Sequence, residues 1–305
     1  LAIPFQLREP RLMTRLHAVT DLDTVLADPV RHDALVVVAH DLPAVAHSLL
    51  SRAFATASAV DAQAAQAISL VPCADAPGGR VVLSPTGPVL RDHDDVRRYT
   101  EAAQAGIRRA RDAGARAPLV VLASPPADER HRNAARVAAL AAIGGLWEPL
   151  EAREALGASA EPVASIGFSV LDGGFGEADA AWVEAVNAGM RLARDLAGTD
   201  PERMAPPNFA QYCVDAFRDT SVTVSVNSDQ DALRRDYPLL SAVARASLDV
   251  ERHRPCVVRL EYAPQGQVER TLLFAGKGLT YDTGGADLKT DGHMAGMSRD
   301  KGGAA

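Results

Sequence analysis

The stretch GKGLTYDTGGADLKT (276–290) follows the apolar run TLLFA (271–275) and combines two lysines, two aspartates and four glycines. An ordinary turn needs one or two glycines, so this density of glycine and charge at the end of a strand-like segment indicates a specialised loop. Carboxylates are oxygen ligands suited to magnesium, manganese or zinc, and one aspartate can bridge two cations. A lysine can join them only after losing its proton, which burial and a nearby dication would favour.

A metal site is therefore our interpretation of this loop, although the spacing alone leaves a solvated loop, a salt bridge or a phosphate-binding loop as alternatives. The phosphate-loop pattern GxxxxGK[ST] is absent from the sequence.

The composition is that of a globular protein with a substantial core: 305 residues, 47% hydrophobic, 23% charged, with a net charge of −7. The length predicts one large or two medium domains. No apolar run approaches the roughly 18 residues of a membrane-spanning helix. The first ten residues, LAIPFQLREP, lack the features of a secretory signal.

Cys73, Cys213 and Cys256 lie far apart in the sequence and match no zinc pattern, so we interpret them as buried thiols of a cytoplasmic protein. The mild acidity argues against nucleic acid as the main partner.

Short β-rich apolar runs alternate with segments of helical period. The predicted strands are 33–40, 67–74, 80–85, 118–125, 165–172, 255–263 and 270–278. Amphipathic helices are predicted within 94–114 and 131–145. Such alternation predicts an α/β fold with a largely parallel or mixed sheet.

The composition changes at LDGGFGEAD (171–179), which opens a long helix with Trp182, Met190 and Leu196 on one apolar stripe. We place the domain boundary here, with an N-terminal α/β domain at 1–172 and a second domain at 173–305 that begins with this connector helix. Three prolines in 201–207 end the helix, and Pro207 starts the next one. The final segment RDKGGAA (299–305) is expected to enter a tightly packed helix of small residues.

The stretch GKGLTYDTGGADLKTDGHMAGMSRDKGGAA (276–305) resembles the core signature of the leucine aminopeptidase, or cytosol aminopeptidase, family of dinuclear metallopeptidases. The segments ARDLAGTDPERMAPPNFA, DYPLLSAVARAS and PCVVRLEY resemble the family more loosely, and the first 170 residues only in architecture. The resemblance implies a smaller N-terminal α/β domain joined by a long helix to a mixed-sheet metallopeptidase domain, of which this sequence holds the first part.

By position, the resemblance implies that Lys277 binds one metal, that Asp282 bridges both metals and that Asp300 is a ligand of the metal held by Lys277. Lys289 resembles the catalytic lysine, which is not a ligand but polarises the scissile carbonyl and stabilises the oxyanion. The implied cofactors are two divalent ions, manganese or zinc, and a bicarbonate.

Three departures from the family pattern change no implied ligand. Thr283 replaces the usual serine, and Lys301 stands where methionine is common. The segment TDGHMAG (290–296) replaces one that commonly reads P-S-A-x-M-D. We interpret His293 as a loop or subunit-contact residue, and Asp287 and Asp291 as solvated or paired with neighbours.

The family's later motif N-T-D-A-E-G-R supplies an aspartate and a glutamate to the metals and an arginine to the bicarbonate, and it is not found in this sequence. We therefore expect a C-terminal segment or a companion chain to complete the site, and residues 1–305 alone to be inactive.

The resemblance implies a cytoplasmic aminopeptidase that hydrolyses N-terminal, leucine-like residues from peptides and forms homohexamers. The alternative is a DNA-binding or scaffold relative with little or no peptidase activity, which a basic stripe on the N-terminal domain would favour. The arginine-rich segments there are interleaved with acidic residues.

Overall fold

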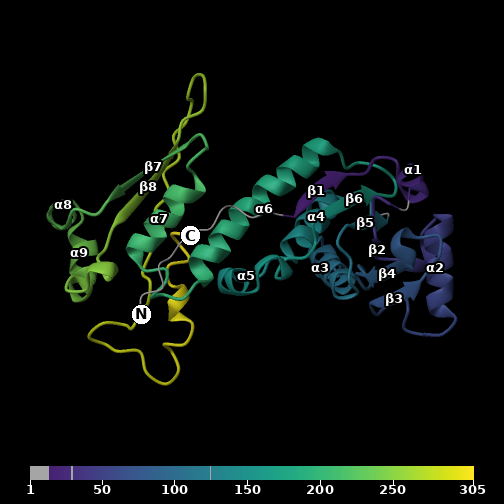
Figure 1. Ribbon diagram of the computed structural model, residues 1–305, viewed down its shortest axis with the longest axis horizontal. Helices are drawn as coiled ribbons and strands as arrows, with labels where there is room; N and C mark the ends of the chain where they lie inside the picture. Colours follow the sequence, from purple (N-terminus) through teal and green to yellow (C-terminus); the bar gives the residue numbers. More distant parts are fainter. Residues whose placement is uncertain (1–13, 29, 124) are drawn as a thin grey trace. The chain divides into compact units, whose positions relative to one another are not determined.

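The structure is a computed structural model that describes residues 14–28, 30–123 and 125–305 (Figure 1). It divides into two compact units. Of the described residues, the N-terminal unit contains 14–148 and Ala152–Arg191, and the C-terminal unit contains Pro149–Glu151 and Leu192–Ala305. The ten residues considered as a signal segment lie outside the described part of the chain.

The N-terminal unit is built on a six-stranded sheet with the order β1-β6-β5-β2-β4-β3. All neighbouring strands are parallel except β3 and β4, which are antiparallel, so the expected largely parallel sheet is confirmed. The strands are β1 Arg15–Ala18, β2 Ala34–Ala39, β3 Ser69–Pro72, β4 Arg80–Pro85, β5 Pro118–Ala123 and β6 Ser165–Val170. The sequence analysis identified the last five of these and missed β1.

Helices cover both faces of this sheet, as the uninterrupted apolar strands require. Every residue of β2 is buried. Val36 and Val38 pack in one cluster with α3 (Arg97–Asp112) and α4 (Ala134–Gly144), and Leu35 and Val37 pack in another with α2 (Ser48–Ser58). The remaining short helices of the first 156 residues are α1 (Leu22–Ala27) and α5 (Leu150–Leu156).

The predicted connector helix is α6, which spans Glu177–Gly198. It begins in the N-terminal unit, and its last turns belong to the C-terminal unit. Among the helices of the described residues, none is both long enough and apolar enough to cross a membrane.

The C-terminal unit pairs β7 (Val222–Asn227) with β8 (Val257–Tyr262) in an antiparallel sheet. Its helices are α7 Pro206–Ala216, α8 Gln230–Asp236 and α9 Pro238–Ala244. Leu196, Met204 and Phe209 form the centre of its core together with Tyr212 and Cys213. The hydroxyl of Tyr212 donates a 2.8 Å hydrogen bond to Asp195, so this buried carboxylate is compensated inside the core.

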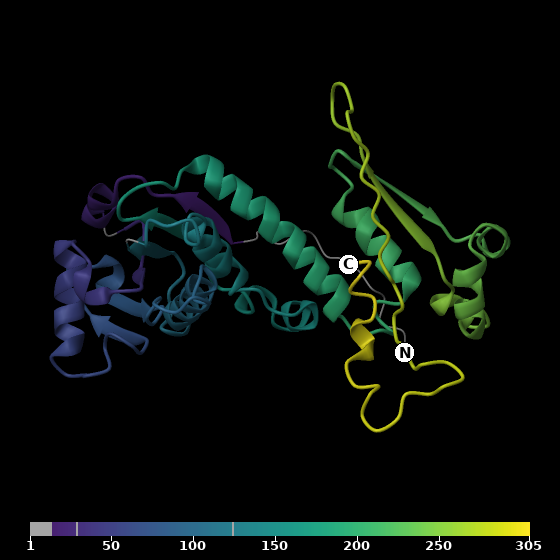
Figure 2. The ribbon, with the colours of Figure 1, turned by 180° about the vertical axis from the view of Figure 1, so that it is seen from behind.

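Two sequence predictions for the C-terminal unit are wrong. Residues 270–278 form no strand, and the segment after β8 runs as an irregular trace (Figure 2). Leu273 and Phe274 are 88% and 91% exposed, because no described strand offers the backbone partners that a strand needs.

The segment Lys301–Ala304 forms turns instead of the expected helix. The backbone N–H of Ala304 is shared between Lys301 O in the same turn and Lys277 O in a different segment. Adjacent glycines at 302 and 303 also disfavour a helix.

Candidate metal centre

Two glycine-containing segments cross in direct backbone contact and build the site. Ala304 N donates a 2.9 Å hydrogen bond to Lys277 O. A Cβ atom on Gly276 would lie 2.1 Å from Gly303 O, so any larger residue would push the two segments apart. The crossing brings the start of the 276–290 loop next to Asp300, which lies in the turn that leads to Gly303.

The four residues singled out from the sequence converge beside this crossing. Lys277 Nζ lies 2.7 Å from Asp300 Oδ2 and 3.3 Å from Asp282 Oδ2. Lys289 Nζ lies 3.0 Å from the same oxygen of Asp282. Two ammonium groups and two carboxylates therefore meet at one place, and Asp282 is their common member.

The loop between Asp282 and Lys289 is closed by hydrogen bonds of its own. Gly284 N donates to Asp282 Oδ1 over 2.9 Å, and Lys289 N donates to Thr283 O over 2.9 Å. The ammonium of Lys289 also contacts Met297 Sδ at 2.9 Å. These contacts keep the carboxylate of Asp282 and the ammonium of Lys289 next to each other.

The mutual pairing shifts the protonation of both kinds of group. The hydrogen bond to Asp300, and after it that to Asp282, raises the pKa of Lys277. The hydrogen bonds from Lys289 and from the N–H of Gly284 hold the pKa of Asp282 well below its usual range. In this arrangement Lys277 is an ammonium ion, so a metal ion that used it as a ligand would have to displace its proton.

The donor set fits a divalent cation in its chemistry but is small. Asp300 Oδ2 is shielded from solvent, takes part in no well-aligned hydrogen bond and lies 2.7 Å from the ammonium of Lys277. Asp282 and Asp300 would supply the hard oxygen atoms that manganese, magnesium or zinc accept. The described residues contain no group of three or more histidines, cysteines and acidic side chains that could hold a metal.

The other polar residues of the loop differ from this cluster in their exposure and in their hydrogen-bond partners. Asp287, Asp291 and His293 are exposed. Asp291 accepts a hydrogen bond from its neighbour Thr290 at 3.1 Å. These positions agree with their interpretation as loop residues.

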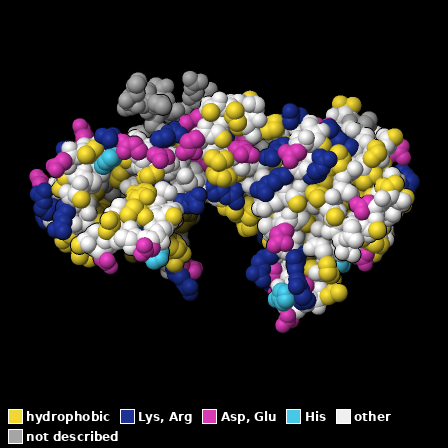
Figure 3. Space-filling model, turned by 90° about the horizontal axis from the view of Figure 1, so that it is seen from below, with side chains coloured by type: hydrophobic (Ala, Val, Ile, Leu, Met, Phe, Trp, Pro, Cys, Tyr) yellow, Lys and Arg dark blue, Asp and Glu magenta, His cyan; other side chains and the backbone are white. Residues whose placement is uncertain are grey.

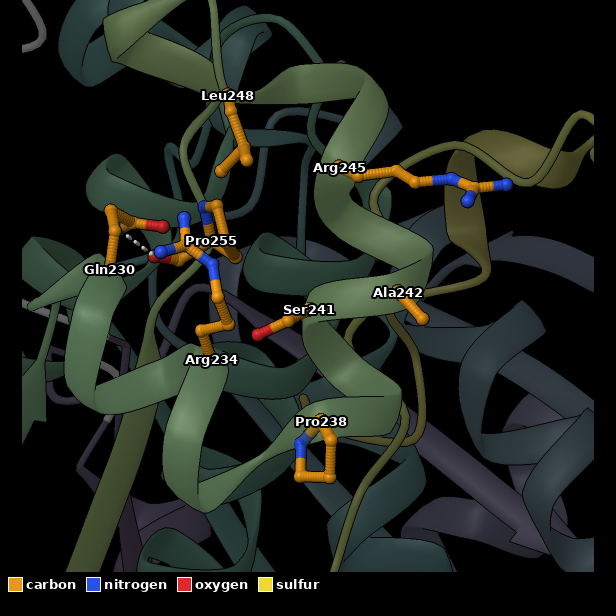
Figure 4. Close-up of a pocket in the computed structure, with 8 residues that line it drawn as sticks. All are labelled: Gln230, Arg234, Pro238, Ser241, Ala242, Arg245, Leu248 and Pro255. Carbon is orange, nitrogen blue, oxygen red and sulfur yellow. Dashed lines mark hydrogen bonds between the residues drawn. The ribbon is translucent and has the colours of Figure 1, made fainter.

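A separate cavity of about 260 Å³ lies between α8, α9 and the segment before β8 (Figure 4). Gln230 Nε2 donates to Pro255 O at its wall, and Arg234, which also lines it, is paired with Asp231. Its lining includes none of the four converging residues.

Sequence reasoning noted Lys301 only as a departure from a pattern, whereas the structure buries it completely. The signal available beforehand was a lysine at a position where methionine is common in the family pattern.

Comparison with known proteins places the converging residues in a known family. Residues 191–305 match the model of the cytosol aminopeptidase family, catalytic domain. Residues 191–305 belong to the cytosol aminopeptidase family.

Curated relatives agree with this family assignment. A putative aminopeptidase of Caenorhabditis elegans is 42% identical over 234 residues, which are 75% of this chain and 43% of the relative. A probable cytosol aminopeptidase of Desulfovibrio desulfuricans is 34% identical over 128 residues, which are 42% of this chain and 24% of the relative. The chain thus spans less than half the length of these relatives.

Solved structures share the fold. A mutant of tomato leucine aminopeptidase superposes with a TM-score of 0.72 at 21% identity, over 97% of this chain and 58% of the tomato chain. A bottromycin maturation enzyme in complex with manganese gives a TM-score of 0.66 at 24% identity, over 89% of this chain and 53% of that enzyme. The α/β architecture expected from the family resemblance is therefore confirmed.

Proposed function

We propose that the whole protein is a metal-dependent aminopeptidase that removes N-terminal residues, with leucine-like side chains preferred, from peptides by a two-metal mechanism. The observation that supports this proposal most directly is the convergence of Asp282 and Asp300 with Lys277 and Lys289, inside the segment that matches the family. In an ordinary solvated loop these side chains would point into water. Here two segments that cross at glycines bring two carboxylates and two ammonium groups together.

In this proposal Lys277, Asp282 and Asp300 hold the cations, which are manganese or zinc. Divalent ions bound there supply Lewis-acid polarisation of the scissile carbonyl and a water nucleophile at neutral pH. Manganese accompanies the bottromycin maturation enzyme of the same fold, which makes it the first ion to test.

Lys289 would donate to the oxygen on which negative charge develops during attack on the peptide carbonyl. The 3.0 Å contact between its ammonium and Asp282 supports this role, because Asp282 is a proposed metal ligand. A bicarbonate, which the family resemblance also implies, would in this proposal be held by an arginine that residues 1–305 do not supply.

Only two carboxylates meet in the described residues, so we expect the remaining acidic ligands to come from a C-terminal segment or a companion chain. Residues 1–305 alone should accordingly turn over no peptide. We further propose that the protein works in the cytoplasm as a homohexamer.

The DNA-binding alternative gains no support from the N-terminal unit. Basic and acidic side chains alternate over the face seen in Figure 3. On α3 and just before it, Arg97 pairs with Asp95, and Arg98 pairs with Asp94. Arginines neutralised in this way are poor phosphate ligands.

The test is a comparison of Asp282→Ala with Asp287→Ala in the whole protein. Metal content and hydrolysis of a leucine amide in the presence of manganese are measured for both. We expect Asp282→Ala to lose metal and activity, and Asp287→Ala, a change in the exposed part of the same loop, to keep both. A wild-type protein without bound divalent ions, or an unaffected Asp282→Ala, would refute the proposal.

A further inference from the structure

Lys301 is the one lysine of the predicted site region that contacts neither carboxylate in the described structure, and it is also the most deeply buried. Its side chain has 0% exposure. Of the 32 basic side chains in the sequence only three are lysines, at 277, 289 and 301, and all others are arginines. A fully buried lysine is rare unless its ammonium is hydrogen bonded, because removing the charge from water is costly.

The ammonium of Lys301 joins two segments that are far apart in the sequence. Nζ donates a 2.9 Å hydrogen bond to Thr199 O, just beyond the C-terminal end of α6. It also donates to Ser298 O, in the turn that leads into Asp300. The last carbonyls of a helix lack partners within the helix and carry partial negative charge, so an ammonium is well suited to this position.

This arrangement fixes Asp300 from both sides. On one side Lys301 ties the 298–301 turn to α6. On the other side Ala304 N is bound to Lys277 O at the glycine crossing. The carboxylate of Asp300 is thereby held 2.7 Å from Lys277 Nζ.

We propose that Lys301 is a positioning residue that sets the affinity of the site for a divalent cation by tying the Asp300 turn to the end of α6. This inference rests on the proposed function, in which Asp300 is a metal ligand. Residues that orient metal ligands typically change metal affinity by about 10-fold to 100-fold when they are replaced.

Lys301→Met separates this role from simple filling of space. Methionine is common at this position in the family pattern; it fills a similar volume with its unbranched chain but cannot donate to Thr199 O or Ser298 O. The matched control is Arg299→Met, which changes an exposed basic residue of the same turn.

The measurement is calorimetric titration of the metal-free whole protein with Mn²⁺. We expect Lys301→Met to raise the dissociation constant at least about tenfold and Arg299→Met to leave it unchanged. Lys301→Met should also have no further effect in an Asp300→Asn background, because a residue that acts through Asp300 is not additive with it. If Lys301→Met fails to fold, Lys301→Leu, which likewise cannot donate to Thr199 O or Ser298 O, takes its place in the same comparisons.

The outcomes separate the two proposals. If the wild-type protein binds no Mn²⁺, the proposed function itself is refuted. Normal Mn²⁺ binding that is weakened by Asp300→Asn but not by Lys301→Met would leave that function standing and overturn the positioning role. A lower melting temperature with an unchanged dissociation constant would likewise show that Lys301 is only structural.

Discussion

At the scale of single residues, Asp282 is the carboxylate that both lysines of the candidate site contact. One of its oxygens, Oδ2, lies 3.3 Å from Lys277 Nζ and 3.0 Å from Lys289 Nζ. Both lysines therefore contact Asp282, but Lys277 alone of the two also contacts Asp300, and they are proposed to differ further once cations bind. Lys277 must give up a proton to become a ligand, and its raised pKa opposes that loss until a cation replaces the proton.

Replacement of each lysine by alanine should separate these roles. Lys289→Ala should lower kcat roughly 10²–10³-fold, the cost of losing one oxyanion donor, and leave metal content intact. Lys277→Ala should lose metal occupancy. Metal analysis and steady-state kinetics of the whole protein check both, and equal metal retention in the two variants would contradict the assignment of Lys277 as a ligand.

At the scale of elements, a pair of stacked histidines lies beside the edge strand β1. The rings of His17 on β1 and His32 before β2 have centroids 5.4 Å apart and planes inclined by 13°. They fit because residue 167 of β6 is glycine: a Cβ there would lie 2.6 Å from the His32 ring. The Nε2 atoms of both rings are buried without a hydrogen-bond partner.

Burial lowers the pKa of both histidines, and Arg31 lowers them further. Glu177 and Glu184 oppose this for His17. For His32 the hydrogen bond with the carbonyl of Ala117, and after it Asp33, opposes it, but the net direction stays downward for both rings. A histidine with a lowered folded pKa binds its proton more tightly when unfolded. Stability is therefore complete above the ordinary pKa of 6.5 and is lost as the pH falls from there toward the folded pKa.

We expect the free energy of unfolding of the N-terminal unit to fall as the pH drops below the ordinary histidine pKa of 6.5. His17→Gln should reduce the proton uptake on unfolding by at most about one. The exposed His93→Gln is the control. Urea denaturation followed by the fluorescence of Trp147 and Trp182, both in this unit, measures the effect. An identical pH dependence in the two variants would show that the stacked pair does not titrate as argued.

At the scale of the whole molecule, assembly is the main open prediction. Trp182 and Met190 on α6 are 45% and 37% exposed, which is the kind of apolar surface that subunit contacts cover. With the family resemblance, this leads us to expect a hexamer. Light scattering of the whole protein at several concentrations tests the expectation, and a monomer at all of them would contradict it.

Elements with a local signal could be predicted from the sequence. β2, β4 and β5 are short β-branched runs between turn residues, and α3 and α6 carry apolar stripes of helical period, so each was predicted near its observed bounds. The alternation of Val222, Val224 and Val226 was a further strand signal that was overlooked in β7. The four candidate site residues were also proposed from the sequence, because their types and spacing resemble the family motif, and their roles stay predictions.

The tertiary structure alone decided which groups meet. The segment 270–278 has the composition of a strand but forms none, since a strand exists only where a neighbour accepts its backbone bonds. Asp300 reaches Lys277 because Gly276 and Gly303 allow two backbones to touch. Lys301 contacts a carbonyl 102 residues away. Local sequence fixes the chemistry of each side chain, whereas contacts between distant segments depend on how the whole chain packs.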